Sequence, residues 1–533
     1  MDQIADIIIV GSGACGAAAA WSLSQLPGVK IVCLEQGDHT VPSGYPSAAI
    51  DWELRRHADY NVSPNVRKLT SDYPIDDTDS PIAIANYNAV GGSTILYSGH
   101  FPRFHPSDFK TKSLDGVGSD WPLTYTELEP YFELNEGMMG IAGLVGDPAY
   151  PDYKSLLPPV PLGPMGKVMA SAFNTLGWHW WPSYSAINTH KHLGRGACIN
   201  LGPCNTGCNQ GAKASVDVTY WPLARRNGVA LFSNCRVREI TVNCTGLVDG
   251  VIYLDQAGNE HRYRAKMVLV ACNGVGTPRL LLNSKSASFP NGLANESGLV
   301  GKNLMIHPLG FVEGVFDHDL RSNIGPHGCC LLSQQFYETD HDRNFFRGYT
   351  MQILRGSPPV ETAVAGYFKR QISIGKNHHK NFRDMFNRTA GIAIISEDLP
   401  ELHNYVELDD AHTDSAGIPG VKVHYKLGDN TKKMLTHGIQ MSKTVFKAAG
   451  GRVISSFAPI KHTGWHLMGT ARMGDIPATS VVNKFGQTHA VKNLFIVDSS
   501  IFVTAGAVNP VATAQALTLF ACEHIRRNLN QWF

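Results

Sequence analysis

Three cysteines lie within eleven residues of this chain, in the stretch "CINLGPCNTGC" at 198–208. Cys198, Cys204 and Cys208 have the spacing C-x5-C-x3-C, with glycines and asparagines between them. Thiols this close together can be metal ligands, a disulfide with one free thiol, redox switches or packed side chains. The whole sequence holds 11 cysteines in 533 residues, too few for a disulfide scaffold, so the choice depends on the rest of the chain.

Two other polar residues could take part in proton chemistry. His466 lies in "GWHLMGTARMG", where neighbouring glycines leave its ring room to face a cavity, although a lone histidine is more often structural. Asn509 precedes Pro510 in "AGAVNPVATAQAL", and this pair suits the N-cap and first position of a helix. Asn509 is therefore a helix cap, a hydrogen-bonding group of a site, or both. A helix N-terminus there would also stabilise a negative charge close to it.

Near the N-terminus, "GSGACG" follows the apolar run "DIIIV" and opens an alanine-rich segment. Gly11 permits a tight turn, Gly13 and the adjacent Ala14 let a pyrophosphate approach the backbone, and Gly16 allows close packing of helix and strand. Glu35 ends a second apolar strand, where a carboxylate would bind a ribose hydroxyl. The pattern predicts a bound dinucleotide and argues against NADP, whereas a glycine-rich helix entry without a ligand is the alternative.

A second glycine-containing stretch is "NYNAVGGSTILYSGHFPRF" at 86–104. Gly91 and Gly92, followed by Ser93, are typical of a loop that lies against a cofactor. Read alone, the same three residues would be an ordinary turn.

These residues need elements that bring distant parts of the chain together. Residues 7–35 have the pattern of a strand, a helix and a second strand, and 230–271 reads as short strands that lead to a buried one. Because nucleotide-binding elements stand at both ends, we expect an α/β chain with a Rossmann-like domain interleaved with an α+β substrate domain on an antiparallel sheet. The expected ranges are 1–110, 225–309 and 451–533 for the nucleotide-binding domain, and 111–224 and 310–450 for the substrate domain and the cysteine-containing loop region.

Composition excludes several classes of function. The chain is 43% hydrophobic and 17% charged with a formal net charge of +1, so a nucleic-acid groove or a polybasic membrane surface is not expected. The charge-free run 501–522 contains Asn509, Pro510 and threonines, and we expect a buried helix there and no membrane span. No signal peptide precedes the first strand, which favours a cytoplasmic location with reduced thiols.

Taken together, the stretches around 6–37, 86–109, 464–474 and 494–528 resemble the glucose–methanol–choline (GMC) family of FAD-dependent oxidoreductases. The resemblance also covers 117–132, 198–218, 267–283 and 298–308, and it leaves only about 310–450 without a motif. It implies that the nucleotide-binding domain binds FAD. It further implies oxidation of an alcohol group of a sugar, glycoside or other polyol by hydride transfer to flavin N5, with electrons passed to an external acceptor.

The resemblance assigns roles to single residues. His466 matches the family's catalytic base, and Asn509 matches the second member of the catalytic pair. Val237 falls where the family binds adenine, and Asp498 where it contacts the ribityl or pyrophosphate region. The other implied FAD contacts are those already named: Gly11, Gly13, Ala14, Gly16, Glu35, Gly91, Gly92, Ser93, Asn509 and Pro510.

The same resemblance bears on how cofactors are held. Some relatives link FAD covalently to a histidine at the position of Leu96, so we expect non-covalent FAD here, with His100 as a weaker site for a linkage. Within the family, the chain looks most like flavoprotein subunits of bacterial glucose dehydrogenase and glucoside 3-dehydrogenase. Those subunits carry a 3Fe–4S cluster on three cysteines, which makes Cys198, Cys204 and Cys208 its expected ligands.

The expected partners are an alcohol or sugar substrate, an external electron acceptor and a small partner subunit or cytochrome. Such a partner could carry the protein to the periplasm. Three alternatives remain open at this point. They are an O2-dependent oxidase that produces hydrogen peroxide, an NAD-dependent dehydrogenase, and a catalytically silent flavin-binding module.

Overall fold

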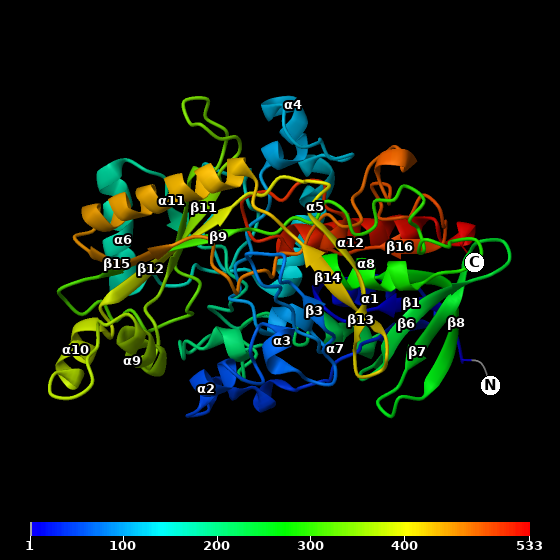
Figure 1. The fold of residues 1–533 in the computed structure, drawn as a ribbon, viewed down its shortest axis with the longest axis horizontal. Coiled ribbons are helices and arrows are strands. Elements are labelled where there is room, and N and C mark those ends of the chain that lie inside the picture. The colour runs from blue at the N-terminus through cyan, green and yellow to red at the C-terminus, as the bar shows by residue number, and fades with distance from the viewer. Residues whose placement is uncertain (1–2, 533) are drawn as a thin grey trace.

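A computed structural model describes residues 3–532 of the chain. One of its two large sheets has seven strands, several of which are labelled in Figure 1. The strands run in the order β5–β2–β1–β8–β7–β6, and β16 pairs with β8. Their bounds are β1 Gln3–Val10, β2 Ile31–Leu34, β5 Ala230–Phe232, β6 Arg236–Val242, β7 Val248–Leu254, β8 Glu260–Val270 and β16 Leu494–Ile496. The central strands pair in parallel and read as unbroken apolar runs, because both faces of this sheet are covered.

Helices pack on this sheet and complete the strand–helix–strand unit predicted for residues 7–35. Helix α1 (Ala14–Leu23) connects β1 to β2, and its small side chains let it lie close to α12 (Val511–Arg527). Helix α12 packs in turn against α5 (Tyr125–Met139), whose start is fixed by a reciprocal capping box between Thr124 and Glu127. The two ends of the chain therefore meet in one core.

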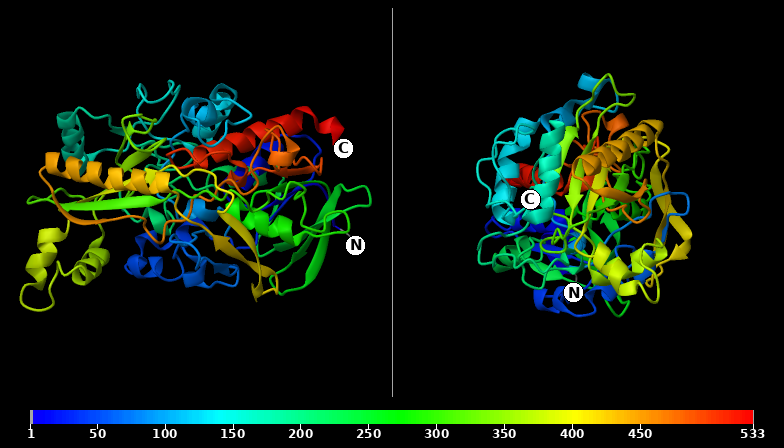
Figure 2. Two further views of the ribbon diagram at one scale, coloured as in Figure 1. Left: turned by 45° about the horizontal axis from the view of Figure 1, so that its top comes forward. Right: turned by 90° about the vertical axis from the view of Figure 1, so that its left-hand side faces the viewer.

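The second large sheet has six strands in the order β15–β9–β12–β11–β10–β4, all antiparallel. Helix α11 (Asp429–Ala448) lies along it, with α6 (Gly163–Leu176) beside α11 (Figure 2). Leucine, methionine and phenylalanine side chains from these elements form a separate core. The strand bounds are β4 Trp181–Pro182, β9 Leu309–Val315, β10 Leu331–Phe336, β11 Tyr349–Leu354, β12 Thr389–Ser396 and β15 Arg452–Phe457.

A small third sheet and several short helices complete the structure. The sheet joins β13 (Tyr405–Thr413), β14 (Pro419–His424) and β3 (Ile75–Asp76). The remaining α-helices are α2 Trp52–Arg56, α3 Pro64–Arg67, α4 Thr111–Asp115, α7 Tyr220–Arg226, α8 Asn273–Asn283, α9 Pro359–Phe368 and α10 His378–Met385.

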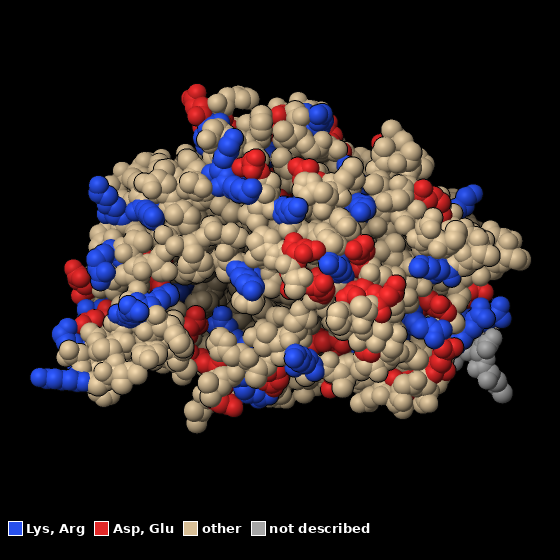
Figure 3. All heavy atoms as spheres, viewed as in Figure 1, with Lys and Arg blue, Asp and Glu red and all other residues tan. Residues whose placement is uncertain are grey.

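The predicted fold class is confirmed, since a Rossmann-like parallel sheet and an antiparallel sheet draw strands from alternating parts of the chain. The domain limits stay a prediction; within 451–533, strand β15 belongs to the six-stranded sheet. On the face shown in Figure 3, basic and acidic side chains are interspersed over most of the surface.

The charge-free run 501–522 is buried but is not one helix. It begins in a short 3-10 turn and a loop, and α12 starts only at Val511. Pro510 occupies the N-cap position of α12, so the interpretation of Asn509 as the helix cap is wrong. Among residues 3–532, no helix combines the length and apolarity that a membrane crossing requires.

Candidate active site

A cavity of about 600 Å³ opens between the two large sheets. On one side it is lined by the carboxyl ends of the parallel strands and the N-terminus of α1, and on the other by β9, β11 and β12. It brings together most of the residues predicted from sequence: Gly11, Gly13, Ala14, Glu35, Gly92, Ser93, Val237, His466, Asp498, Asn509 and Pro510. Open α/β sheets bind their ligands at this end of the strands.

The loop between β1 and α1 is shaped for backbone contact with a ligand. A Cβ on Gly11 would lie 2.5 Å from the carbonyl oxygen of Ala271, and one on Gly16 would lie 1.9 Å from that of Gly11. Gly16 does not line the cavity, because it packs the helix against the strand. Helix α1 begins at Ala14 and presents its free N–H groups and positive dipole end to the cavity.

Glu35 supports this loop from the end of β2. Its Oε2 accepts hydrogen bonds from the backbone N–H of Ser12 (2.9 Å) and from the Ser12 hydroxyl (2.7 Å), and its Oε1 accepts one from the Gly37 N–H (2.8 Å). Burial raises the pKa of the Glu35 carboxyl, and these bonds offset part of that effect. The predicted contact with a ribose stays a prediction, but the supporting role of Glu35 was not foreseen.

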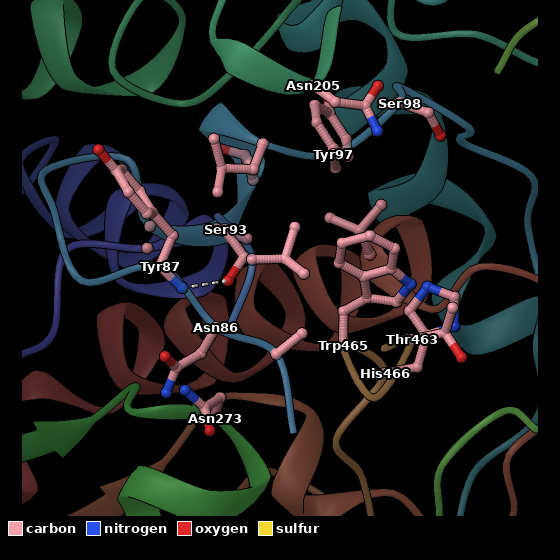
Figure 4. Close-up of a pocket in the computed structure, with 18 of the residues that line it drawn as sticks. Asn86, Tyr87, Ser93, Tyr97, Ser98, Asn205, Asn273, Thr463, Trp465 and His466 are labelled. Carbon is pink, nitrogen blue, oxygen red and sulfur yellow. Dashed lines mark hydrogen bonds between the residues drawn. The ribbon is translucent and has the colours of Figure 1, made fainter. Parts of the chain in front are cut away.

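The second glycine pair lies directly against the first loop. The Gly91 N–H donates to the carbonyl of Ser12 at 3.2 Å, and a short 3-10 turn starts at Gly92. The Ser93 hydroxyl accepts a hydrogen bond from the Tyr87 N–H (Figure 4). Gly91 itself stands behind the cavity wall, against Asp217 and Ile95. Residues 91–93 therefore do form a turn, and this turn lies against the first glycine loop at the cavity.

Asp498 ties two elements together beside the cavity. Its Oδ2 accepts from the Asn273 N–H (3.1 Å) and the Thr277 hydroxyl (2.6 Å) at the start of α8, and its Oδ1 accepts from the Ser500 N–H (2.8 Å). These bonds hold the chain after β16 against α8.

His466 and Asn509 meet at the cavity wall, with the Asn509 Nδ2 3.4 Å from the His466 Nε2. Figure 4 shows His466 and Trp465 on one side of the cavity, opposite Asn86, Tyr87 and Ser93. Burial and the neighbouring rings of His307 and His100 lower the pKa of His466 well below its ordinary value. The imidazole is therefore neutral near pH 7 and can accept a proton.

Sequence reasoning missed two residues that contact this pair. The His307 Nδ1 lies 2.8 Å from the His466 Nδ1, and the Gln352 Nε2 donates to the Asn509 Oδ1 at 2.5 Å. Neither carries a local signal, because His307 stands 159 residues from His466 and Gln352 lies in the stretch without recognisable motifs.

The positions considered for a flavin linkage both line the cavity. Leu96 is buried there and offers no nucleophile. His100 is also buried, and neither of its ring nitrogens has a hydrogen-bond partner among the described residues. Burial lowers the pKa of His100 to about 4, so its ring is neutral as well.

The three cysteines do not form the predicted site. Within residues 3–532, no group of three histidine, cysteine or acidic side chains is placed to hold a metal ion, and every cysteine is free. The structure thus does not support the 3Fe–4S cluster or a disulfide. Burial raises the pKa of Cys204 to about 12, and the buried Lys213 Nζ donates to the backbone carbonyls of Ile95, Tyr97 and Cys204. Burial raises the pKa of Cys198 as well, so Cys198 and Cys204 are packed as protonated thiols.

The residues of the cavity fit FAD. The two glycine loops leave a cradle that any added Cβ would narrow, and a helix N-terminus faces it. Comparison with known proteins agrees with this fit. Family models described as GMC oxidoreductase match residues 5–309 and 400–518.

Similar curated proteins cover nearly the whole chain. A 2-methyl-1,2-propanediol dehydrogenase from Mycolicibacterium austroafricanum is 39% identical over 98% of this chain and 96% of its own. Paromamine 6'-oxidase from Streptomyces fradiae is 30% identical (99% and 92%), and the fructose dehydrogenase large subunit from Gluconobacter japonicus is 28% identical (99% and 98%).

Solved structures share the fold at low sequence identity. Pyridoxine 4-oxidase from Mesorbium loti superposes with a TM-score of 0.69 at 17% identity, covering 98% of this chain and 99% of its own. A formate oxidase variant from Aspergillus oryzae gives a TM-score of 0.69 at 15% identity and covers both chains fully.

Proposed function

Because the chain belongs to the GMC oxidoreductases, we propose that it oxidises an alcohol group of a polyol or sugar-like substrate with non-covalently bound FAD. The observation that carries this proposal is the neutral His466 beside Asn509 at the wall of the cavity that the two glycine loops border. Membership of the family makes the chain an FAD-dependent oxidoreductase; the substrate class and the roles of single residues are the proposal.

The cofactor would be held mainly by backbone groups. Gly11, Gly13 and the start of α1 would face its pyrophosphate, Gly92 and Ser93 its flavin side, and Val237 its adenine. When bound, FAD supplies the acceptor for the hydride that leaves the alcohol carbon. Leu96, at the position of the family's linkage, supports non-covalent binding.

His466 and Asn509 would divide the work on the substrate oxygen. The Nε2 of neutral His466 accepts the hydroxyl proton as the C–H bond breaks. The Asn509 Nδ2 donates a hydrogen bond that fixes the same oxygen, which limits the positions the reacting carbon can take. The proton and the hydride thus leave toward different acceptors.

The substrate class rests on the relatives and on the lining of the cavity. The relative at 39% identity is named for a 1,2-diol, and the other two are named for paromamine and for fructose. The same cavity is lined by apolar Phe311 and Leu354 and by polar Gln352 and His327. A small diol or polyol can place its hydrocarbon part against the apolar side chains and its hydroxyl groups against the polar ones.

Two electron acceptors are supported by different relatives. The dehydrogenases favour an external carrier. The fructose dehydrogenase large subunit and a gluconate 2-dehydrogenase flavoprotein from Pantoea cypripedii, which is 25% identical to this chain, carry names that support a small partner subunit or cytochrome. Relatives named oxidases favour O2 as a second candidate. The route of electrons is not assigned to the three cysteines.

The test is anaerobic mixing of the purified holoenzyme with 2-methyl-1,2-propanediol, other polyols and monosaccharides, followed by flavin absorbance. We expect loss of the oxidised flavin bands with at least one of them. No bleaching by any alcohol would contradict the proposed function. Repeating the reaction in air distinguishes the two electron acceptors. An oxidase then produces stoichiometric peroxide, whereas a dehydrogenase turns over only with an added electron-accepting dye.

A further inference from the structure

We propose that His307 and Gln352 are positioning residues that fix the Nε2 of His466 as its proton-accepting nitrogen. The inference rests on the proposed function, in which His466 accepts the substrate proton. It is carried by a chain of hydrogen bonds that runs from two backbone carbonyls, through His307, His466 and Asn509, to Gln352.

The backbone carbonyls at one end of this series of hydrogen bonds set the tautomer of His307. Its Nε2 lies 2.8 Å from the carbonyl oxygen of Gly506 and 3.2 Å from that of Ala505. Carbonyl oxygens only accept hydrogen bonds, so this nitrogen carries the hydrogen. The ring is fully buried, and burial lowers the pKa of His307 to about 4, which keeps the ring neutral. The Nδ1 of His307 therefore has only a lone pair.

This lone pair determines the state of His466. The two Nδ1 atoms lie 2.8 Å apart, and a hydrogen must stand between them. Since His307 cannot supply that hydrogen, the Nδ1 of neutral His466 donates it. The Nε2 of His466 is then free of hydrogen and faces Asn509 and the cavity. The opposite tautomer would place two lone pairs against each other.

The hydrogen bonds at Gln352, the other end of this series, have the polarity that His307 imposes. Gln352, on strand β11 of the six-stranded sheet, donates from its Nε2 to the Asn509 Oδ1. This bond engages the oxygen of the amide and turns its NH2 group toward the His466 Nε2. A flipped amide would face that lone pair with an acceptor. Both ends of the chain thus give the same polarity.

The consequence is that His466 needs no tautomer change before it can take a proton. Without His307, neutral His466 would be free to carry its hydrogen on Nε2, and that form cannot accept the proton of a substrate in the cavity. An imidazole held in the wrong tautomer loses most of its value as a base.

The direct test is NMR of the holoenzyme with ring-15N-labelled histidine, in which the His466 signals are assigned by their loss in His466→Gln. We expect His466 in wild type to carry hydrogen on Nδ1 and none on Nε2. In His307→Leu we expect signals from the other tautomer. A wild-type ring with hydrogen on Nε2 would overturn the proposal, and this readout needs no substrate and no variant of His307.

Kinetics then separate positioning from general damage. Asparagine can offer an oxygen near the place of the His307 Nδ1 and an NH2 group toward the carbonyls, so it serves as the conservative variant. Anaerobic flavin reduction should slow at least about tenfold in His307→Leu, with little change in the half-saturating substrate concentration. His307→Asn should recover most of that loss. Equal rates in wild type and the Leu variant would overturn the proposal.

Gln352 is tested with a matched pair of variants. Gln352→Met removes the donor at nearly the same size, and Gln352→Glu replaces it with an acceptor that favours the flipped Asn509 amide. We expect slower flavin reduction in both, with the larger loss in Gln352→Glu. The reverse order would contradict the assigned polarity. If no alcohol reduces the wild-type flavin while the tautomer is as expected, the proposed function fails and the hydrogen-bond polarity stands.

Discussion

Gly92 lies so close to Gly13 that a Cβ built on Gly92 would stand 2.8 Å from the Gly13 Cα. The two glycine motifs, which the sequence separates widely, are therefore in backbone contact and form one floor of the cavity. The close approach requires glycine at position 92, where φ is also +56°.

Replacement of Gly92 by alanine should expel the cofactor. The added Cβ meets backbone, which cannot rotate away, so the loops must separate at the place where FAD would lie. Gly28→Ala is the matched control, because Gly28 has φ +74° but open space around its Cβ position, and its cost should be about 1 kcal/mol. The measurement is the ratio of bound flavin to protein after gel filtration. Full flavin content in Gly92→Ala would show that the loops tolerate the separation.

Glu35→Gln should weaken cofactor retention without unfolding the chain. The carboxylate accepts three hydrogen bonds from Ser12 and Gly37, and the glutamine amide would turn an NH2 group toward one of these donors. A lost buried hydrogen bond of this kind costs about 1–3 kcal/mol. Release of flavin fluorescence on heating should begin at a lower temperature than in wild type, whereas Asp38→Asn, at an exposed neighbour, should behave as wild type. Identical release curves for wild type and Glu35→Gln would argue against a supporting role.

The motifs with short spacing were the ones that sequence could predict. Gly11, Gly13 and Glu35 belong to one strand–helix–strand unit, so local pattern is enough to place them at the end of a parallel sheet. Asn509 and His466 could be named as a pair only through the family resemblance, because nothing local joins them.

What could not be predicted depends on contacts between distant segments. The hydrogen bond of His307 to His466 joins the segment before β9 to the segment between β15 and β16. That of Gln352 to Asn509 joins β11 to the loop between β16 and α12. The cysteine spacing was misleading for a related reason. Spacing along a loop does not fix the direction of its side chains. In the structure Lys213 donates to the backbone carbonyl of Cys204, and among the described residues the three thiols are not placed to hold a metal ion.

Asp398 should make stability depend on pH. Burial raises the pKa of this carboxyl from its ordinary 3.8 to about 7, against hydrogen bonds from Tyr425, Ile306 and Thr431. The folded state holds the proton more tightly than the unfolded state. The stabilisation of the folded state that comes from protonated Asp398 is therefore fully present below pH 4 and is lost as the pH rises through 7. A pKa that is raised by about three units changes the free energy of unfolding by about 4 kcal/mol at most.

Asp398→Asn removes this titration and keeps an oxygen for Tyr425 and Ile306. The difference in thermal midpoint between the variant and wild type should therefore grow in favour of the variant between pH 4 and pH 8. Paired melting curves at several pH values check this. A difference that stays constant, or that grows in favour of wild type, would contradict the raised pKa.

The central claim is that an alcohol reduces the flavin of this chain while His466 takes the hydroxyl proton. Anaerobic stopped-flow recording of flavin bleaching, in wild type and His466→Ala at equal flavin content, measures it most directly. The account predicts that a diol or sugar bleaches the wild-type flavin and that the alanine variant keeps its FAD but reacts at least about 100-fold more slowly. Bleaching at the same rate in both proteins would contradict it.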